Sequence, residues 1–113
     1  MEIRDINDNY SATGQIQPEH VADLKEMGFK SIICNRPDDE EIGQPSASTI
    51  EKAAREAGLA FRHIPFTGAQ MDQGHVEAMA KALDEMEGPV LAYCRSGARS
   101  TNIHAAVCEK NGG

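Results

Sequence analysis

Three times along this chain a helical pattern ends at a glycine and a short apolar segment follows it. The glycines are Gly28, Gly58 and Gly88, and the apolar segments cover residues 29–34, 59–66 and 89–93. Glycine readily ends a helix, and short apolar runs between turn residues are typical of buried strands. Helices and strands that alternate in this way predict an α/β fold, with a mostly parallel sheet flanked by helices on both faces.

The remaining segments complete this predicted fold. Asparagine and aspartate tolerate turn conformations, so residues 7–9 predict a hairpin between extended segments at 2–6 and 10–13. Helices are expected to begin at Pro18, after Ser46 or Ser48, after Asp72, and from about Ser100 onward, because these residue types favour helix starts. The first of these helices repeats Val21, Leu24 and Met27 at helical spacing.

Length and charge restrict the classes of protein to which this chain can belong. Its 113 residues suffice for one domain, 1–113, with a single core. A net charge of −7 argues against a general nucleic-acid binder, whose affinity comes from Lys and Arg. No run approaches the roughly 18 apolar residues of a membrane span, and the first residues lack the apolar core of a signal peptide. We therefore expect a cytoplasmic protein without nucleic-acid or membrane partners.

The cysteines and histidines do not form a metal-binding pattern. Cys34, Cys94 and Cys108 stand at no metal-like spacing, and the four histidines form no pattern with them. In a chain without an export signal, such cysteines indicate reduced thiols rather than disulfides. No metal or cofactor is expected. Cys108 falls on the apolar stripe of the last helix and is expected in the core, whereas Cys34 is either buried or a thiol that forms a disulfide with Cys94.

The segment that carries chemistry follows the last predicted strand. This strand covers residues 89–93, Cys94 follows it, and Arg95-Ser96-Gly97-Ala98-Arg99-Ser100 leads into a helix. Backbone N–H groups of a tight loop and of a first helical turn bind anions, and the same positive field lowers a cysteine pKa. The pattern predicts a nucleophilic Cys94 thiolate beside a bound anion; the alternative is a buried core cysteine.

Each residue of the loop has an expected role. Arg99 binds the anion, while Arg95 lowers the thiol pKa and attracts anions, although both arginines can equally be plain surface charges. Ser100 either donates a hydrogen bond to the thiolate or simply caps the helix. The amides of residues 95–99, which include Ser96, Gly97 and Ala98, line the substrate.

Two further groups are expected near the loop because they end neighbouring strands. In parallel sheets ligands bind beyond the carboxyl ends of the strands, where Asn35 and Arg36 should also lie. Arg36 either lines the site or pairs with Asp38 or Glu40. His63 either faces the site or is a structural histidine.

The chain resembles known families through these motifs. Its Cys-x4-Arg loop resembles the active loop of rhodanese sulfurtransferases and is one residue shorter than the Cys-x5-Arg loop of cysteine-dependent phosphatases. The motifs at residues 12–15, 35–38 with Glu40, 43–46, 63–65 and 88–100 resemble the bacterial β-lactamase-hydrolase-like family. Its members are described as a phosphatase-like domain and often as sulfur transferases. The resemblance implies a dual-specificity-phosphatase-like fold that carries a rhodanese-sized loop.

The short loop, together with the lack of a clear general acid, favours sulfur transfer as the expected function. In that interpretation Cys94 attacks the outer sulfur of thiosulfate or a small persulfide, and the Cys94 persulfide passes its sulfur to a thiol acceptor. The first alternative is a phosphatase that forms a phosphocysteine on Cys94. It requires a general acid, for which Asp72 is the first candidate and Asp38 and Asp39 are the next two. The second alternative is a non-catalytic module that binds anions or thiols.

Overall fold

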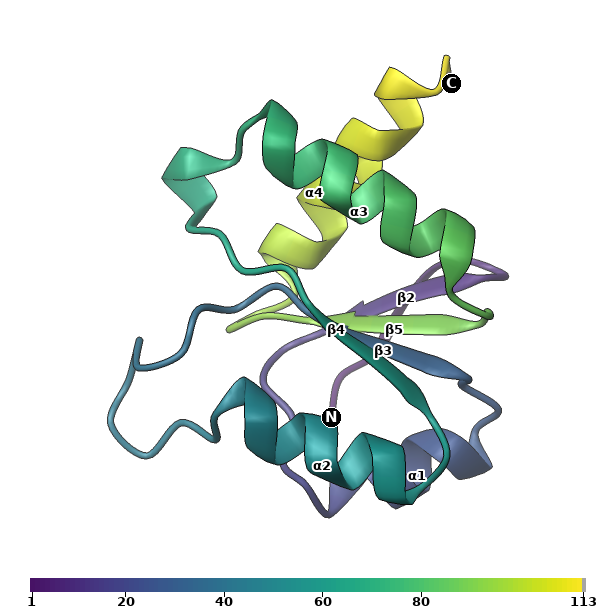
Figure 1. Cartoon of the computed structure of the whole chain (residues 1–113), viewed down its shortest axis with the longest axis vertical. Helices are drawn as coiled ribbons and strands as arrows, with labels where there is room; N and C mark the ends of the chain where they lie inside the picture. The colour runs from purple at the N-terminus through teal and green to yellow at the C-terminus, as the bar shows by residue number, and fades with distance from the viewer. Residues whose placement is uncertain (113) are drawn as a thin grey trace.

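The computed structural model describes residues 1–112 as five strands, four α-helices and one short 3-10 helix (Figure 1). The elements follow in the order β1 (Arg4–Asn7), β2 (Tyr10–Thr13), α1 (His20–Glu26), β3 (Ser31–Cys34), α2 (Ala47–Glu56), β4 (Ala60–His63), η1 (Gly68–Gln70), α3 (Gln73–Glu85), β5 (Val90–Tyr93) and α4 (Ala98–Lys110). Among these residues no helix has both the length and the apolar character that crossing a membrane requires.

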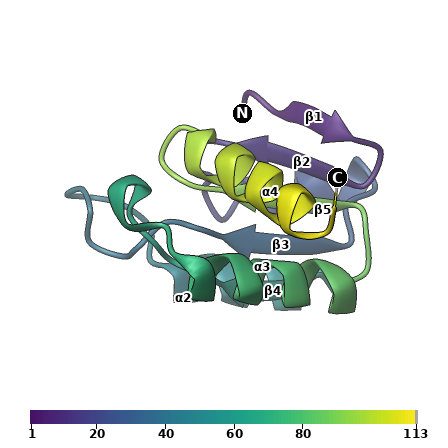
Figure 2. The same cartoon turned by 90° about the horizontal axis from the view of Figure 1, so that it is seen from above.

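The sheet confirms the predicted α/β architecture. Its strand order is β1-β2-β5-β3-β4; β2, β5, β3 and β4 run parallel, and only β1 is antiparallel to its neighbour. Helices α1 and α2 cover one face and α3 and α4 the other, with α3 beside α4 in the view from above (Figures 1 and 2). The predicted hairpin is the β1–β2 pair.

Alternation along the strands divides the core into two layers. Ile32 of β3 packs toward α1 and α2, whereas its neighbour Ile33 packs toward α3 and α4. Successive side chains of a strand point to opposite faces, so a strand covered by helices on both faces is apolar throughout. This is why β3 and β5 are buried at every position.

Several element boundaries and burial expectations differ from the sequence interpretation. Strand β4 ends at His63, well before residue 66, because Pro65 has no N–H to continue the ladder. Helix α4 begins at Ala98 rather than near Ser100. Met27 follows the last turn of α1 and is 60% exposed, and Cys108 is only partly buried rather than in the core.

The parallel sheet brings the predicted site residues to one edge. Cys94 directly follows β5 and Asn35 directly follows β3, and these two strands are paired with Cys34 beside Tyr93. The backbone N–H of Asn35 donates to the carbonyl of Tyr93 at 2.8 Å. The carboxyl ends of the two central strands therefore present their following residues side by side.

Candidate active site

The loop after β5 folds around the sulfur of Cys94. The Cys94 N–H donates to the carbonyl of Thr13 in β2 (3.3 Å), and the Gly97 N–H donates to the Cys94 Sγ (3.0 Å). Gly97 caps α4 with a φ of 95°, a conformation that glycine adopts without strain. A Cβ on Gly14 would lie 2.9 Å from the carbonyl oxygen of Arg95, so glycine there allows β2 to approach the loop closely.

Backbone dipoles favour the thiolate form of Cys94. Burial alone raises the pKa of this thiol, but hydrogen bonds from the backbone N–H groups of Ser100, Ser96, Gly97 and Arg99 outweigh that effect and lower it below its ordinary value. These amides belong to the loop and to the first turn of α4, whose dipole points its positive end at the sulfur. Cys94 itself is buried beneath these groups.

The guanidinium of Arg99 is already bound by other groups of the protein. Its Nη1 and Nη2 donate to the two carboxylate oxygens of Glu40 at 2.9 and 2.8 Å, and Nη1 also donates to the carbonyl of Phe66 at 3.0 Å. The Arg99 side chain is 15% exposed. Hydrogen bonds from Arg99, against an opposing effect of burial, bring the pKa of Glu40 to about 2. Sequence reasoning missed this pair.

Arg36 pairs with Glu40, which was one of the two roles expected for it. Its Nε donates to Glu40 Oε1 at 2.9 Å, and its Nη1 donates to Gln15 Oε1 at 3.0 Å. Arg36 is 1% exposed, so it lies behind Glu40 rather than open to a ligand. A buried guanidinium requires such partners, because an unpaired charge away from water is strongly destabilising. Arg36 thus supports the site through Glu40.

The position of Arg95 fits a surface charge, which was one of the two roles expected for it. Its side chain is 68% exposed and its nearest acidic partner is Glu41, at 3.8 Å. The main groups that lower the thiol pKa are backbone amides. A different arginine, Arg4 of β1, reaches the loop, since its Nη2 donates to the carbonyl of Ser96 at 3.2 Å. No local sequence pattern marks Arg4, which is 92 residues from Ser96 in the chain.

Ser100 and Asn35 meet beneath the loop. The Ser100 hydroxyl donates to Asn35 Oδ1 at 2.8 Å instead of to the thiolate, and the Asn35 amide donates to the carbonyl of Ile64 at 3.1 Å. Both residues are fully buried. The expected hydroxyl contact with Cys94 is therefore wrong, and Ser100 acts on the sulfur through its backbone N–H. Asn35 lies under Ser100 and not at the surface of the loop.

Two of the three acids considered as proton donors accept hydrogen bonds at helix starts. Asp72 caps α3 by accepting from the His75 N–H at 3.0 Å, and its side chain is 71% exposed. Asp38 accepts from the N–H of Ala47 at the start of α2, at 2.8 Å. Asp39 lies in the exposed loop with a φ of 63°. Asp72 and Asp38 are thus explained by helix starts rather than by the loop.

Cys34 and His63 both contact the backbone carbonyl of Arg36. The buried Cys34 thiol donates to the carbonyl of Arg36 at 3.3 Å, and burial raises its pKa, so it is held as a thiol. The His63 Nε2 donates to the same carbonyl at 2.9 Å. Within residues 1–112, no three His, Cys, Asp or Glu side chains cluster in a way that could hold a metal ion.

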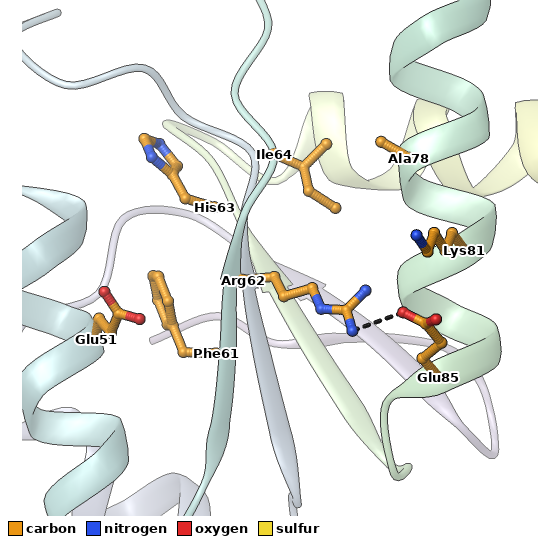
Figure 3. Close-up of a pocket in the computed structure, with 8 residues that line it drawn as sticks. All are labelled: Glu51, Phe61, Arg62, His63, Ile64, Ala78, Lys81 and Glu85. Atoms are coloured by element: carbon orange, nitrogen blue, oxygen red, sulfur yellow. Dashed lines mark ion pairs between the residues drawn. The ribbon is translucent and has the colours of Figure 1, made fainter.

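A hollow of about 400 Å³ lies at the outer edge of the sheet, away from the loop (Figure 3). Strand β4 runs through it, with Phe61 and His63 on the α2 side and Arg62 directed toward α3. The Arg62 Nη2 pairs with Glu85 Oε1 across this hollow at 2.7 Å. Its lining includes none of residues 94–100.

Comparison with curated proteins finds relatives much longer than this chain. β-Lactamase hydrolase-like proteins of Xylella fastidiosa (strain Temecula1) and Agrobacterium fabrum are each 36% identical to it, over 105 and 99 residues. These matches cover 93% and 88% of this chain but only 24% and 23% of the relatives. The chain therefore spans about a quarter of their length.

Comparison with solved structures finds phosphatase folds. A candidate phosphatase of Neisseria meningitidis Z2491 superposes with a TM-score of 0.90 at 32% identity, covering 100% of this chain and 80% of that one. The core catalytic domain of the PP-IP phosphatase Siw14 from S. cerevisiae, in complex with citrate, superposes with a TM-score of 0.72 at 13% identity, covering 95% and 64%. The second likeness concerns the fold alone.

These comparisons favour the phosphatase alternative over sulfur transfer, and the rhodanese-like interpretation of the loop gains no support from them. The family model for the β-lactamase hydrolase-like protein, phosphatase-like domain, matches residues 2–109. With a match over nearly the whole chain and relatives at 36% identity, this chain belongs to the phosphatase-like domain of the β-lactamase hydrolase-like family.

Proposed function

We propose that this chain is a cysteine-dependent phosphatase that acts on a small phosphorylated anion through Cys94. The observation that carries the proposal is the contact between the Gly97 N–H and the Cys94 Sγ, at 3.0 Å, within amides that lower the thiol pKa. A thiolate surrounded by inward-facing N–H groups suits a nucleophile that attacks an anionic centre. Membership of the phosphatase-like family supports the same reaction class.

The proposed reaction has two balanced steps. The Cys94 thiolate attacks phosphorus, forms an S–P bond and breaks the P–O bond, so that the leaving oxygen departs with the electron pair. The loop amides and Arg99 stabilise the charge on the phosphoryl oxygens. Water then attacks the phosphocysteine and the S–P bond breaks. Inorganic phosphate leaves with both protons of the water, and the thiolate is restored. No cofactor takes part in either step.

The arrangement of acids points to the kind of leaving group. Asp72 caps α3, and Asp38 accepts from a backbone N–H at the start of α2. The pKa of Glu40 is too low for it to hold a proton near neutral pH. A general acid contributes about 10²–10⁴-fold when the leaving oxygen is a poor leaving group. We therefore propose substrates whose leaving group needs no proton, such as aryl or acyl phosphates and phosphoanhydrides.

One observation keeps sulfur transfer as a second candidate. Four residues separate Cys94 from Arg99, the spacing that resembles the rhodanese loop. A Cys94 persulfide would contact the same amides as a phosphoryl group, with thiosulfate or a small persulfide as donor and a thiol as acceptor.

Intact-mass spectrometry separates these candidates. We expect the chain to hydrolyse p-nitrophenyl phosphate, to lose that activity in Cys94→Ser, and to show a mass increase of one phosphoryl group on Cys94 when the reaction is quenched in acid. A stable gain of one sulfur atom from thiosulfate, without phosphate hydrolysis, would establish the sulfurtransferase instead. If the chain binds anions but forms neither adduct, the result would support the non-catalytic module.

We also propose a cellular location and a domain organisation for the chain. Its three cysteines are free, which suits the reducing cytoplasm. Since the family match covers residues 2–109, we propose that the chain forms one self-contained domain, alone or as a part of longer relatives.

A further inference from the structure

Two adjacent glutamates cover the arginines of the loop. Glu40 accepts from both terminal nitrogens of Arg99, at 2.9 and 2.8 Å, and Glu41 lies 3.8 Å from Arg95. The parallel pair of hydrogen bonds between Arg99 and Glu40 is the geometry with which a guanidinium binds two oxygens of a carboxylate or a phosphate. The Arg99 face that would grip a substrate anion is thus filled by a side chain of the protein.

Glu40 is firmly placed in this position. Arg36, fully buried, donates from Nε to the same Oε1 atom that Arg99 binds, and Gln15 holds Arg36 from the other side. The pKa of about 2 keeps Glu40 charged at neutral pH. Because Arg36 is a second partner, the carboxylate retains one ion pair when Arg99 releases it.

We propose that Glu40 is a specificity-determining residue: an internal carboxylate ligand of Arg99 that the substrate anion must displace. The inference rests on the proposed function, since it names the group with which the substrate competes. A carboxylate monoanion brings Arg99 the same charge and the same two acceptor oxygens that Glu40 already provides. A phosphoryl dianion offers more negative charge and a further oxygen for the loop amides. Glu40 therefore excludes carboxylates from the loop and admits phosphoryl groups.

A role in positioning Arg99 predicts the opposite result. If Glu40 served only to orient the guanidinium, its removal would weaken anion binding, because Arg99 would lose its fixed geometry. If Glu40 competes with the substrate, its removal strengthens anion binding. The sign of the change separates the two roles.

Direct binding of inorganic phosphate to the 113-residue chain, measured by isothermal titration calorimetry, tests the proposal. We expect Glu40→Gln and Glu40→Ala to bind phosphate on the order of tenfold more tightly than the wild type. Glu77→Gln, an exposed glutamate of α3 with the same change in charge, should bind like the wild type. Unchanged or weaker binding in both Glu40 variants overturns the proposal, and Glu40→Gln preserves the shape of the side chain if Glu40→Ala is unstable.

Competition by acetate provides a second measurement, which should not change if the role of Glu40 is purely structural. In Glu40→Ala, acetate should occupy the vacated position on Arg99 and compete with phosphate, whereas the wild type should not respond to it. Equal competition in the two proteins overturns the proposal. Because binding is measured rather than turnover, a chain that binds phosphate but hydrolyses no ester would refute the proposed function while still testing the role of Glu40.

Discussion

The Ser100 hydroxyl donates to Asn35 Oδ1 at 2.8 Å and so turns its proton away from Cys94. The direction of this bond is fixed, because the Asn35 amide nitrogen already donates to the carbonyl of Ile64 and only its oxygen is left to face Ser100. The thiolate is therefore stabilised by backbone N–H groups, among which that of Ser100 has the largest effect on the thiol pKa.

Ser100→Ala should leave the Cys94 pKa unchanged, because the backbone N–H of residue 100 remains. The variant should lose about 1–3 kcal/mol of stability, since the buried Asn35 oxygen loses its donor. The rate of iodoacetamide alkylation against pH reports the pKa, and urea unfolding reports the stability.

Asn35→Ala and the double variant complete a cycle with Ser100→Ala. We expect a coupling energy of about 0.5–3 kcal/mol between the two residues. A rise of about one unit in the thiol pKa of Ser100→Ala would instead mean that the hydroxyl bonds the sulfur in solution.

Patterns local in sequence predicted the fold and the place of Cys94 in it. Glycines that end helices, and apolar strands between them, indicate the α/β order, and a cysteine at a strand end before a glycine loop indicates backbone N–H groups close to its sulfur. Strand ends were predicted less well, since β4 stops at His63 where Pro65 interrupts it.

Contacts between distant segments could not be predicted from the sequence. Glu40 and Arg99 are 59 residues apart, and only the folded sheet brings the loop after β3 beside the start of α4. The width of the Cys94 loop also depends on backbone dihedrals such as the φ of 95° at Gly97, which a count of residues does not give. The count, together with the lack of a clear general acid, favoured sulfur chemistry, whereas the comparisons with known proteins favour a phosphatase.

Gly97→Ala should open the loop. An alanine at a φ of 95° costs about 1–2 kcal/mol, and its Cβ would lie 3.3 Å from the carbonyl carbon of Thr13. As the loop moves, the Gly97 N–H leaves the sulfur and the thiol pKa rises, which alkylation at neutral pH detects as slower reaction. Gly28→Ala is the control, since it has a φ of 102° with open space around it. It should lose comparable stability, and its thiol should react like that of the wild type; slower alkylation there would contradict the local effect.

The stability of the chain should depend on pH through Cys94. The folded-state pKa of the thiol lies below its ordinary value of 9.0. Between the two values the folded chain holds a thiolate while the unfolded chain binds a proton, so stability rises with pH. The contribution is complete above 9.0 and is lost as pH falls through the folded-state pKa. Urea midpoints of the wild type relative to Cys94→Ser should increase with pH over this window. A difference that stays flat or declines would show that the pKa is not lowered.

Asp72→Ala distinguishes a helix cap from a general acid. If Asp72 only caps α3, its removal should lower the free energy of unfolding by about 0.5–2 kcal/mol. The rates of hydrolysis of p-nitrophenyl phosphate and of an alkyl phosphate should then change in the same proportion. Ser46→Ala is the matched control, because Ser46 caps α2 by accepting from the Thr49 N–H at 3.2 Å and carries no carboxyl group. Both variants should lose stability without losing selectivity between the two esters. A general acid would behave differently: without it, turnover of the alkyl ester alone would fall by about 10²–10⁴-fold, because only the poor leaving group needs the proton.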